Sequence, residues 1–232
     1  MSDVVLIPGN MCDARLWVPV AEMLEADGHR VRHATRLDQG SIVAMADAVL
    51  STEEEPFVAV GFSMGAIVAA EMACRAPERV AAAALIAFNA SADLPERAAV
   101  RPRQQGAVRS GALKTVVSDE LKPNYLADAN RGDADLLGTV MQMAVALGPE
   151  VFVTQSEALR LRRDLRSELP SLKMPVLLAC GSEDLLCPPE WHRQWREAIG
   201  NNASFSEISQ AGHLVPLEQA EALASALHCW LT

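Results

Sequence analysis

The sequence predicts an α/β fold: a mostly parallel sheet of about six strands with helices on both faces, interrupted by an inserted helical cap. Short apolar runs alternate with helical patterns of about ten residues, which is typical of βαβ units in a parallel sheet. The early apolar runs lack the polar alternation of a sheet with one solvent-exposed face, so helices should cover both faces. The alternation stops after Phe88 and resumes near residue 174, which indicates the insertion.

The first part of the chain holds four predicted strands and three helices. The run VVLI is continuous and apolar, as expected for a strand that is buried on both faces. The helix after it has one apolar face and ends at Gly28, and the next helix begins after Ser41, a suitable N-cap residue. The strands are predicted at residues 4–7, 31–35, 57–61 and 80–88, and the helices at 16–24, 41–50 and 66–76.

The segment from residue 91 to residue 170 shows helix-like stretches and no convincing buried strand. These stretches lie at about 96–109, 111–121, 133–147 and 150–164. Beyond them, strands are predicted at 174–181 and 203–208, and helices at 189–199 and 216–231. We therefore predict a core domain of residues 1–90 and 171–232 and a helical cap of residues 91–170.

Composition and charge argue against several classes of function. The formal net charge is −10, and an acidic surface repels the phosphates of nucleic acid. The five cysteines include no CxxC pair and match no zinc-site spacing, so we expect no bound metal. No apolar run looks long enough to span a bilayer, and the N-terminal segment lacks the features of a signal peptide. We expect a cytoplasmic protein without membrane insertion, and its oligomeric state stays open.

The pentapeptide GFSMG, residues 61–65, is the first candidate for chemistry. It lies between a predicted strand and a predicted helix, and a serine at such a tight turn needs very small residues two before and two after it. Gly61 and Gly65 meet that need, so Ser63 is the candidate nucleophile. Met64 can offer its backbone N–H to a developing oxyanion. The alternative is an ordinary serine that caps the next helix.

A serine nucleophile requires a base, and the base requires an orienting acid. Among the five histidines, His213 lies in a loop between the last predicted strand and helix, at the sheet edge where Ser63 stands. Asp184 and Glu183 both follow a predicted strand at that edge, and the spacing of Gly181 and Pro188 favours Asp184. The order Ser63, Asp184, His213 fits a catalytic triad in this architecture. Asp184 as a helix cap is the alternative.

Four motifs together, LIPGN, GFSMG, GSEDLLCP and AGHLVPLE, resemble the α/β-hydrolase superfamily, in particular compact serine esterases with a helical cap, similar to carrier-protein methyl esterases. The resemblance covers the core and does not reach into the cap. By position, it implies that Asn10 supplies the second oxyanion N–H, with Met11 as the weaker choice. The sequence departs from the family in having Pro8-Gly9 where relatives have His-Gly, and in lacking the N-terminal antiparallel hairpin.

The expected activity is hydrolysis of a carboxylic ester or thioester of a small acyl substrate through an acyl-enzyme, with no cofactor. Carbon–carbon bond hydrolysis, perhydrolysis and lyase chemistry on the same triad remain alternatives, as does a non-catalytic ligand receptor of the same fold. We expect Met11, Trp17, Tyr125 and Leu185 to line the substrate pocket, unless the cap's apolar residues simply pack its helices together. The cap arginines could bind an anionic group, but their equal number of acids favours ion pairs within the cap.

Overall fold

The computed structural model describes residues 1–35, 37–121 and 125–232, and its centre is one parallel sheet. The strand order is β2-β1-β3-β4-β5-β6, and every neighbouring pair is parallel. This confirms the predicted fold class. The strands are β1 (Asp3–Ile7), β2 (Arg30–His33), β3 (Phe57–Phe62), β4 (Val80–Ile86), β5 (Val176–Gly181) and β6 (Ala203–Ile208).

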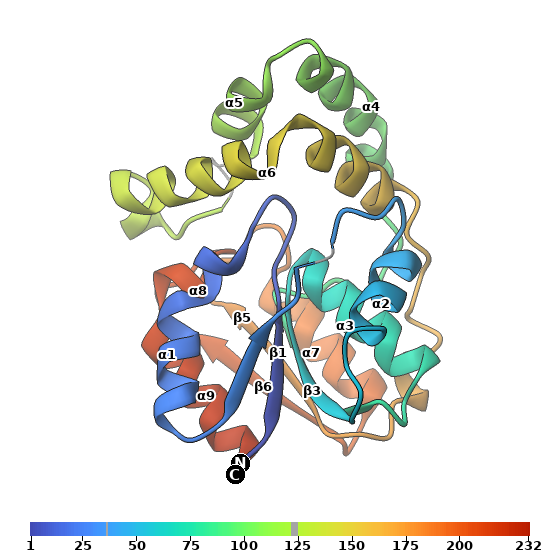
Figure 1. Cartoon of the computed structure of the whole chain (residues 1–232). Helices are drawn as coiled ribbons and strands as arrows, with labels where there is room; N and C mark the ends of the chain where they lie inside the picture. The colour runs from blue at the N-terminus through green and yellow to red at the C-terminus, as the bar shows by residue number, and fades with distance from the viewer. Residues whose placement is uncertain (36, 122–124) are drawn as a thin grey trace.

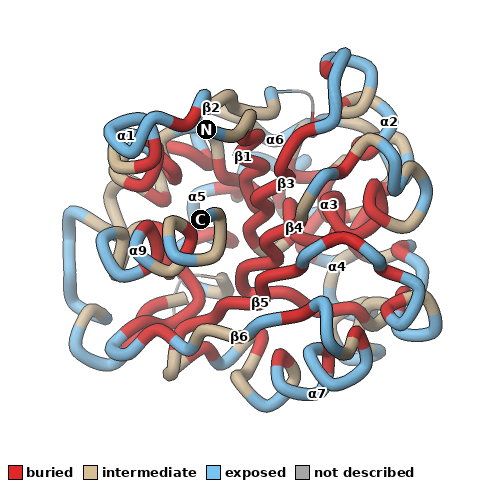
Figure 2. The backbone as a smooth tube through the Cα atoms, turned by 90° about the horizontal axis from the view of Figure 1, so that it is seen from below, coloured by how far each residue is buried: buried red, intermediate tan, exposed pale blue. Residues whose placement is uncertain are grey.

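Helices cover both faces of the sheet (Figure 1). One face packs against η1 and α1, with α8 and α9, and the other packs against α2, α3 and α7. In Figure 2 the central strands are buried along their whole length, and exposed residues gather on the outer sides of the helices. The bounds are η1 (Ala14–Trp17), α1 (Val18–Ala26), α2 (Ile42–Leu50), α3 (Met64–Arg75), α7 (Pro189–Ile199), α8 (Val215–Glu218) and α9 (Ala220–Leu231).

Local signals explain where several elements begin and end. The Ser41 hydroxyl accepts a hydrogen bond from the Ala44 N–H at 3.1 Å, so Ser41 caps α2 as predicted. β3 is buried at all six of its residues, as its apolar sequence requires. β4 ends at Ile86, two residues earlier than predicted, because Ala87 has a φ of 52° and leaves the extended conformation.

The segment between β4 and β5 lies over the carboxyl edge of the sheet (Figure 1). Its described part contains helices and no strand, with a small apolar cluster of its own around Val108, Val116 and Phe152. We call residues 91–170 the cap segment, and the domain boundaries given above stay a prediction. Its elements are α4 (Pro95–Arg109), α5 (Leu113–Thr115), η2 (Val116–Leu121), η4 (Asp128–Asn130), α6 (Ala134–Arg160) and η5 (Leu169–Ser171).

α6 is the one helix in the described part of the chain that is long and apolar enough to cross a membrane. The sequence predicts two separate helices here, at 133–147 and 150–164, and the backbone agrees with this division. The backbone of α6 breaks at Gly148, where φ is 82° and ψ is 175°, just before Pro149. Each half is then shorter than the roughly 20 residues that a membrane span needs.

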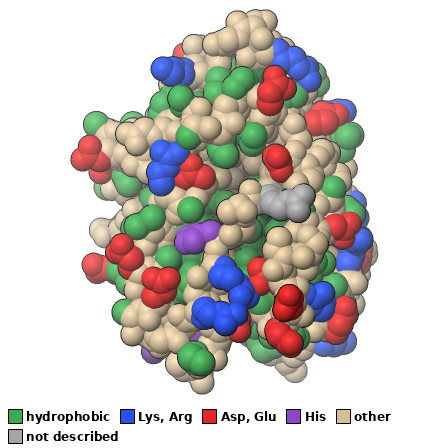
Figure 3. Space-filling model, in the orientation of Figure 1, with side chains coloured by type: hydrophobic (Ala, Val, Ile, Leu, Met, Phe, Trp, Pro, Cys, Tyr) green, Lys and Arg blue, Asp and Glu red, His purple; other side chains and the backbone are tan. Residues whose placement is uncertain are grey.

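Charged side chains of both signs lie close together on the face shown in Figure 3. Ion pairs occur in both parts of the molecule, for example Arg193–Glu207 in the core and Arg103–Glu120 in the cap segment. A group of basic side chains lies below the centre of this view, directly beside acidic ones, although the chain as a whole carries a net charge of −10.

Candidate active site

Ser63 occupies a strained turn between β3 and α3. Its φ of 51° and ψ of −111° are unfavourable for a residue with a side chain. The turn closes only because its flanking residues are glycines: a Cβ on Gly61 would lie 2.3 Å from the Gly65 carbonyl oxygen, and a Cβ on Gly65 would lie 2.1 Å from that of Ile7. Strain of this kind commonly marks a functional residue. The turn therefore presents the Ser63 hydroxyl at the carboxyl edge of the sheet.

The structure brings Ser63, His213 and Asp184 into one hydrogen-bonded chain. His213 Nε2 lies 3.0 Å from Ser63 Oγ, and His213 Nδ1 lies 2.9 Å from Asp184 Oδ2. The side chains of His213 and Asp184 are nearly inaccessible to solvent. A carboxylate on one ring nitrogen keeps the proton there, so the other nitrogen is free to accept the serine proton.

The environment of Asp184 favours its ionised form. Burial raises the pKa of this carboxyl, but the charge and hydrogen bond of His213 and the two backbone amides outweigh burial, so the pKa lies below its ordinary value. The amides belong to Leu186 and Cys187, whose N–H groups donate to Asp184 Oδ1 at 2.8 and 2.9 Å. Glu183 instead accepts the Asp128 N–H at 2.9 Å, which ties it to the cap segment.

The loop after β5, which carries Asp184, and the loop after β6, which carries His213, approach each other closely through their backbones. A Cβ on Gly181, at the end of β5, would lie 2.2 Å from the carbonyl oxygens of Ala211 and Gly212. The His213 N–H donates to the Tyr125 carbonyl at 2.7 Å, and the ring of Phe62 lies 5.2 Å from the imidazole. The loops after β3, β5 and β6 therefore converge at one edge, as the sequence reading expected.

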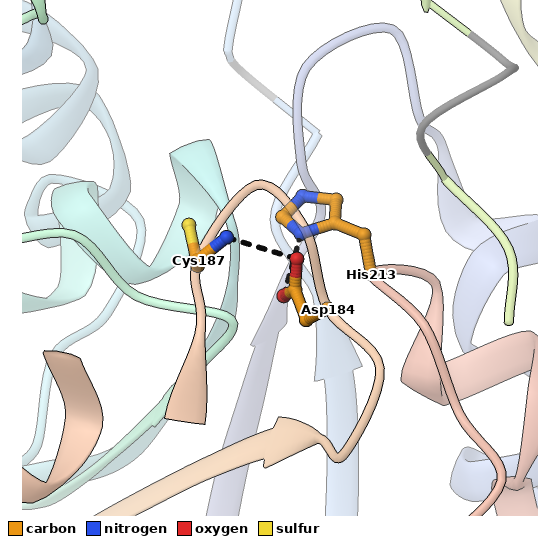
Figure 4. A group of neighbouring side chains, drawn as sticks. All are labelled: Asp184, Cys187 and His213. Atoms are coloured by element: carbon orange, nitrogen blue, oxygen red, sulfur yellow. Dashed lines mark hydrogen bonds and ion pairs between the residues drawn. The ribbon is translucent and has the colours of Figure 1, made fainter. Parts of the chain in front are cut away.

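Cys187 lies beside the acid and the base, as Figure 4 shows. One ligand atom from each of Asp184, Cys187 and His213 lies within 4.8 Å of the others. Burial raises the pKa of the Cys187 thiol, whereas a metal ligand must be a thiolate. Both ring nitrogens of His213 are already engaged by Asp184 and Ser63. The donor set therefore fits a hydrogen-bonded triad better than a metal site.

Two backbone amides are available as oxyanion donors. Neither the Asn10 N–H nor the Met64 N–H donates to another described residue, and both residues line the cavity that contains Ser63. The Met11 N–H is occupied, since it donates to Gln155 Oε1 at 2.8 Å. Of the two choices after β1, the geometry therefore favours Asn10 over Met11.

A cavity of about 440 Å³ lies between the carboxyl edge and the cap segment. Ser63 and His213 line it, together with apolar side chains such as Phe62 and Leu186. Tyr125, one of the four predicted pocket residues, also lines it. Acidic and basic side chains of the cap segment also line it, so the cavity is more polar than the mostly apolar pocket that is usual for small-molecule ligands.

The other three predicted pocket residues do not line this cavity. Met11 is buried and belongs to the same apolar cluster as Val108 and Phe152 of the cap segment. Trp17 is fully buried and supports the ring of Phe62 edge-on from the core side, at 6.5 Å between centroids. Leu185 is 60% exposed, because the loop turns its neighbour Leu186 toward the cavity instead.

Ion pairs engage most of the cap arginines, which is the alternative that the charge count favours. Asp93 is buried between Arg101 and Arg162, at 2.6 Å from each. Arg103, Arg160 and Arg163 also pair with acids. Arg97 lines the cavity, and among the described residues its hydrogen-bond partner is the Leu186 carbonyl, at 3.2 Å, rather than an acid.

His192 is a second buried histidine near the site, and its role is structural. Its Nε2 accepts the Phe88 N–H at 2.8 Å, and its Nδ1 lies 3.2 Å from the Pro188 carbonyl. This arrangement requires a neutral ring with the proton on Nδ1. Burial lowers the pKa of His192 to about 4, so the ring stays neutral at pH 7.

Gln155 and Arg97 are two residues near the site that the sequence does not predict. Both lie inside helices of the cap segment, and their contacts are with loops that are far away in the chain. No local pattern marks either residue, since each could equally well face solvent on an amphipathic helix.

Known proteins resemble this chain in sequence and in fold. A pimeloyl-[acyl-carrier protein] methyl ester esterase of Neisseria meningitidis is 27% identical over 79% of this chain and 73% of its own length. The structure of a thermophilic esterase from Thermogutta terrifontis with malate bound has a TM-score of 0.91 and 27% identity, over 100% of this chain and 89% of that one. An enol-lactonase from Burkholderia xenovorans has a TM-score of 0.87 and 24% identity, over 100% and 92%.

The family model for alpha/beta hydrolases matches residues 4–226, nearly the whole chain. The matched range contains the parallel sheet, the strained turn at Ser63 and the residues His213 and Asp184. The match also confirms the resemblance that the four motifs carry. The chain belongs to the alpha/beta hydrolase family.

Proposed function

We propose that the protein is a serine hydrolase that cleaves a carboxylic ester or thioester of a small acyl substrate. The observation that carries this proposal is the hydrogen-bonded chain from Ser63 through His213 to Asp184, with distances of 3.0 and 2.9 Å. The Ser63 end of this row of hydrogen bonds lies in a cavity of about 440 Å³, whose size suits a small substrate. The sequence relative described as a methyl ester esterase and the structural neighbour described as an esterase support the same reaction class.

The reaction proceeds in two halves. In the first, Ser63 Oγ attacks the acyl carbon while His213 Nε2 takes its proton, and the carbonyl oxygen becomes an oxyanion held by the Asn10 and Met64 amides. Collapse of this intermediate expels the alcohol or thiol, which receives the proton from His213. In the second half, His213 takes a proton from a water molecule, which attacks the acyl carbon of the acyl-enzyme. The bond between the acyl carbon and Ser63 Oγ then breaks, His213 returns the proton to Oγ, and the acid leaves. Asp184 stabilises the imidazolium in both halves.

In this proposal, residues 1–90 and 171–232 form the catalytic core and residues 91–170 form the cap. The cap closes the cavity over Ser63 and contributes Tyr125, whose carbonyl also holds the His213 backbone. Location in the cytoplasm stays a prediction.

Hydrolysis of nitrophenyl esters and acyl thioesters, from acetyl to octanoyl, tests the proposal. The wild type should hydrolyse at least one member of the series, and Ser63→Ala and His213→Ala should each lose at least a factor of about 10³ in kcat. Ser118→Ala, which changes an exposed serine of the cap segment, is the matched control and should keep full activity. A folded wild type that hydrolyses none of these substrates, or a fully active Ser63→Ala variant, contradicts the proposal.

A further inference from the structure

Gln155 connects the cap segment to the loop after β1. It lies on α6 beyond the break at Gly148, and only 2% of it is exposed. Its Oε1 accepts hydrogen bonds from the Met11 N–H at 2.8 Å and from Asn10 Nδ2 at 3.1 Å. Its Nε2 donates to the Leu37 carbonyl at 2.9 Å. All three partners lie in the core, more than 110 residues away in the chain.

The loop to which Gln155 is hydrogen-bonded is a tight turn that contains an unfavourable backbone conformation. The Cys12 N–H donates to the Gly9 carbonyl at 3.1 Å, and Met11 has a φ of 54° while Asn10 keeps a negative φ. A negative φ at the second position and a positive φ at the third are typical of a type II turn, whose third position normally requires glycine or asparagine. A type I turn differs from it by a rotation of the central peptide, here the one between Asn10 and Met11.

The Met11 N–H belongs to that central peptide, so its bond to Gln155 selects the type II orientation. Without this acceptor, a side chain at Met11 favours the negative φ of a type I turn. The hydrogen bonds of Gln155 therefore offset the strain at Met11. They also keep the Met11 N–H, the competing candidate donor, out of the oxyanion hole.

The hydrogen bond that closes the turn of residues 9–12 fixes the direction of the Asn10 N–H. The Gly9 carbonyl and the Asn10 N–H belong to one planar trans peptide and point in opposite directions. Because the carbonyl is held by Cys12, the N–H faces away from the turn, and Asn10 lines the cavity beside Ser63. Rotation of the central peptide alone would leave the Gly9–Asn10 peptide in place. Gln155 acts on this donor through its second hydrogen bond, from Asn10 Nδ2 at 3.1 Å, which fixes the residue that carries the N–H.

We propose that Gln155 is a positioning residue for the oxyanion hole: its bonds to Asn10 Nδ2 and to the Met11 N–H together hold the residue whose backbone N–H faces the substrate cavity. The inference rests on the proposed esterase function. It makes formation of the hole depend on the docking of α6, since the acceptor comes from the cap segment and the donors come from the core.

Steady-state kinetics of Gln155→Met, with a nitrophenyl ester that the wild type hydrolyses, tests the proposal. Met fills the space of Gln without accepting from Met11. Loss of a whole oxyanion donor costs on the order of 10²–10³ in rate, so a misaimed donor should lower kcat by about 10- to 100-fold and leave KM within about threefold. Inhibition by a trifluoromethyl ketone, whose adduct with Ser63 carries an oxyanion, should weaken by the same factor.

Two further variants separate positioning from stability. Gln155→Glu retains an oxygen that accepts from Met11 and should recover kcat to within about tenfold of the wild type. Gln105→Met removes another buried glutamine of the cap segment, one that bonds to Ser156 and Glu157, and should lower the melting temperature without changing kcat or ketone inhibition. If Gln155→Met does not fold, Gln155→Asn, whose amide is one methylene too short to reach Met11, replaces it.

Equal kcat and ketone inhibition in the wild type and in a folded Gln155→Met or Gln155→Asn variant overturns the inference. An equal loss of both in Gln105→Met overturns it as well, because the effect would then be a general one of cap stability. Inactivity of the wild type toward every ester would refute the proposed function and this inference with it, whereas an active wild type with an unaffected Gln155 variant refutes the inference alone.

Discussion

Replacing Asp184 by Asn should preserve the shape of the site and remove most of its activity. The side-chain amide of Asn has one acceptor and one donor end, and it can be placed in two ways. Asp184 Oδ1 now accepts two backbone N–H groups, and Oδ2 faces His213 Nδ1. If the amide oxygen stays on the two backbone N–H groups, the NH₂ group faces His213 and forces Nδ1 to accept.

The opposite placement is unfavourable. It would point the NH₂ group at the Leu186 and Cys187 amides and leave two buried donors unsatisfied, at about 1–3 kcal/mol each. The oxygen therefore stays where it is, and His213 carries its proton on Nε2, where it can no longer accept the proton of Ser63. A wrong tautomer of this kind lowers kcat by about 10⁴, or roughly 5.5 kcal/mol in the barrier.

The assay is kcat and KM for a nitrophenyl ester, with circular dichroism as a check on folding. Glu183→Gln is the matched control, since it changes the neighbouring carboxylate, which contacts Asp128 rather than His213. We expect this control to keep kcat within about threefold. An Asp184→Asn variant that keeps more than a tenth of wild-type kcat, or a Glu183→Gln variant that loses as much as Asp184→Asn, would refute the reasoning.

Three other predictions concern stability and specificity. His192 has a pKa of about 4 when folded and about 6.5 when unfolded, so the unfolded chain binds more protons between these values and stability falls as pH decreases from 6.5 to 4, by roughly 3 kcal/mol for this group. Urea unfolding should show a smaller pH dependence in His192→Gln, and an unchanged slope contradicts the assignment. Gly65→Ala places a Cβ 2.1 Å from a backbone oxygen and should cost about 3 kcal/mol and most of the activity, while Gly138→Ala, in open space on α6, should be neutral or stabilising in the same melts. Arg97→Gln should raise KM about tenfold for esters that carry a carboxylate and leave KM for neutral esters unchanged, because a charge-assisted hydrogen bond is lost; equal effects on both would disprove this role.

Local sequence patterns were sufficient for much of the fold. Continuous apolar runs mark buried parallel strands, and each of the six predicted strands overlaps an observed one. The end of β4 differs because the backbone at Ala87 turns to a positive φ, and nothing about an alanine signals this. The break in α6 could be predicted, since Gly148 and Pro149 stand together in the sequence.

The placement of Ser63, Asp184 and His213 beside one another was also predictable, whereas their catalytic roles stay a prediction. Ser63 needs two glycines at fixed spacing, and Asp184 and His213 need loops at one edge of a parallel sheet. The pocket was harder to predict, because an apolar side chain next to a catalytic loop can face either the cavity or the core. Trp17 faces the core. Gln155 was missed because its role comes from a contact across 144 residues of chain.

Labelling with a fluorophosphonate, followed by mass spectrometry of the peptides, tests the central claim most directly. The reagent reacts with a serine that a histidine activates and whose oxyanion is stabilised. The account predicts one modified residue, Ser63, with labelling absent in Ser63→Ala and slowed at least about 10³-fold in His213→Ala. An unlabelled wild type, or a label on a serine other than Ser63, would contradict the claim that Ser63, His213 and Asp184 form a working triad.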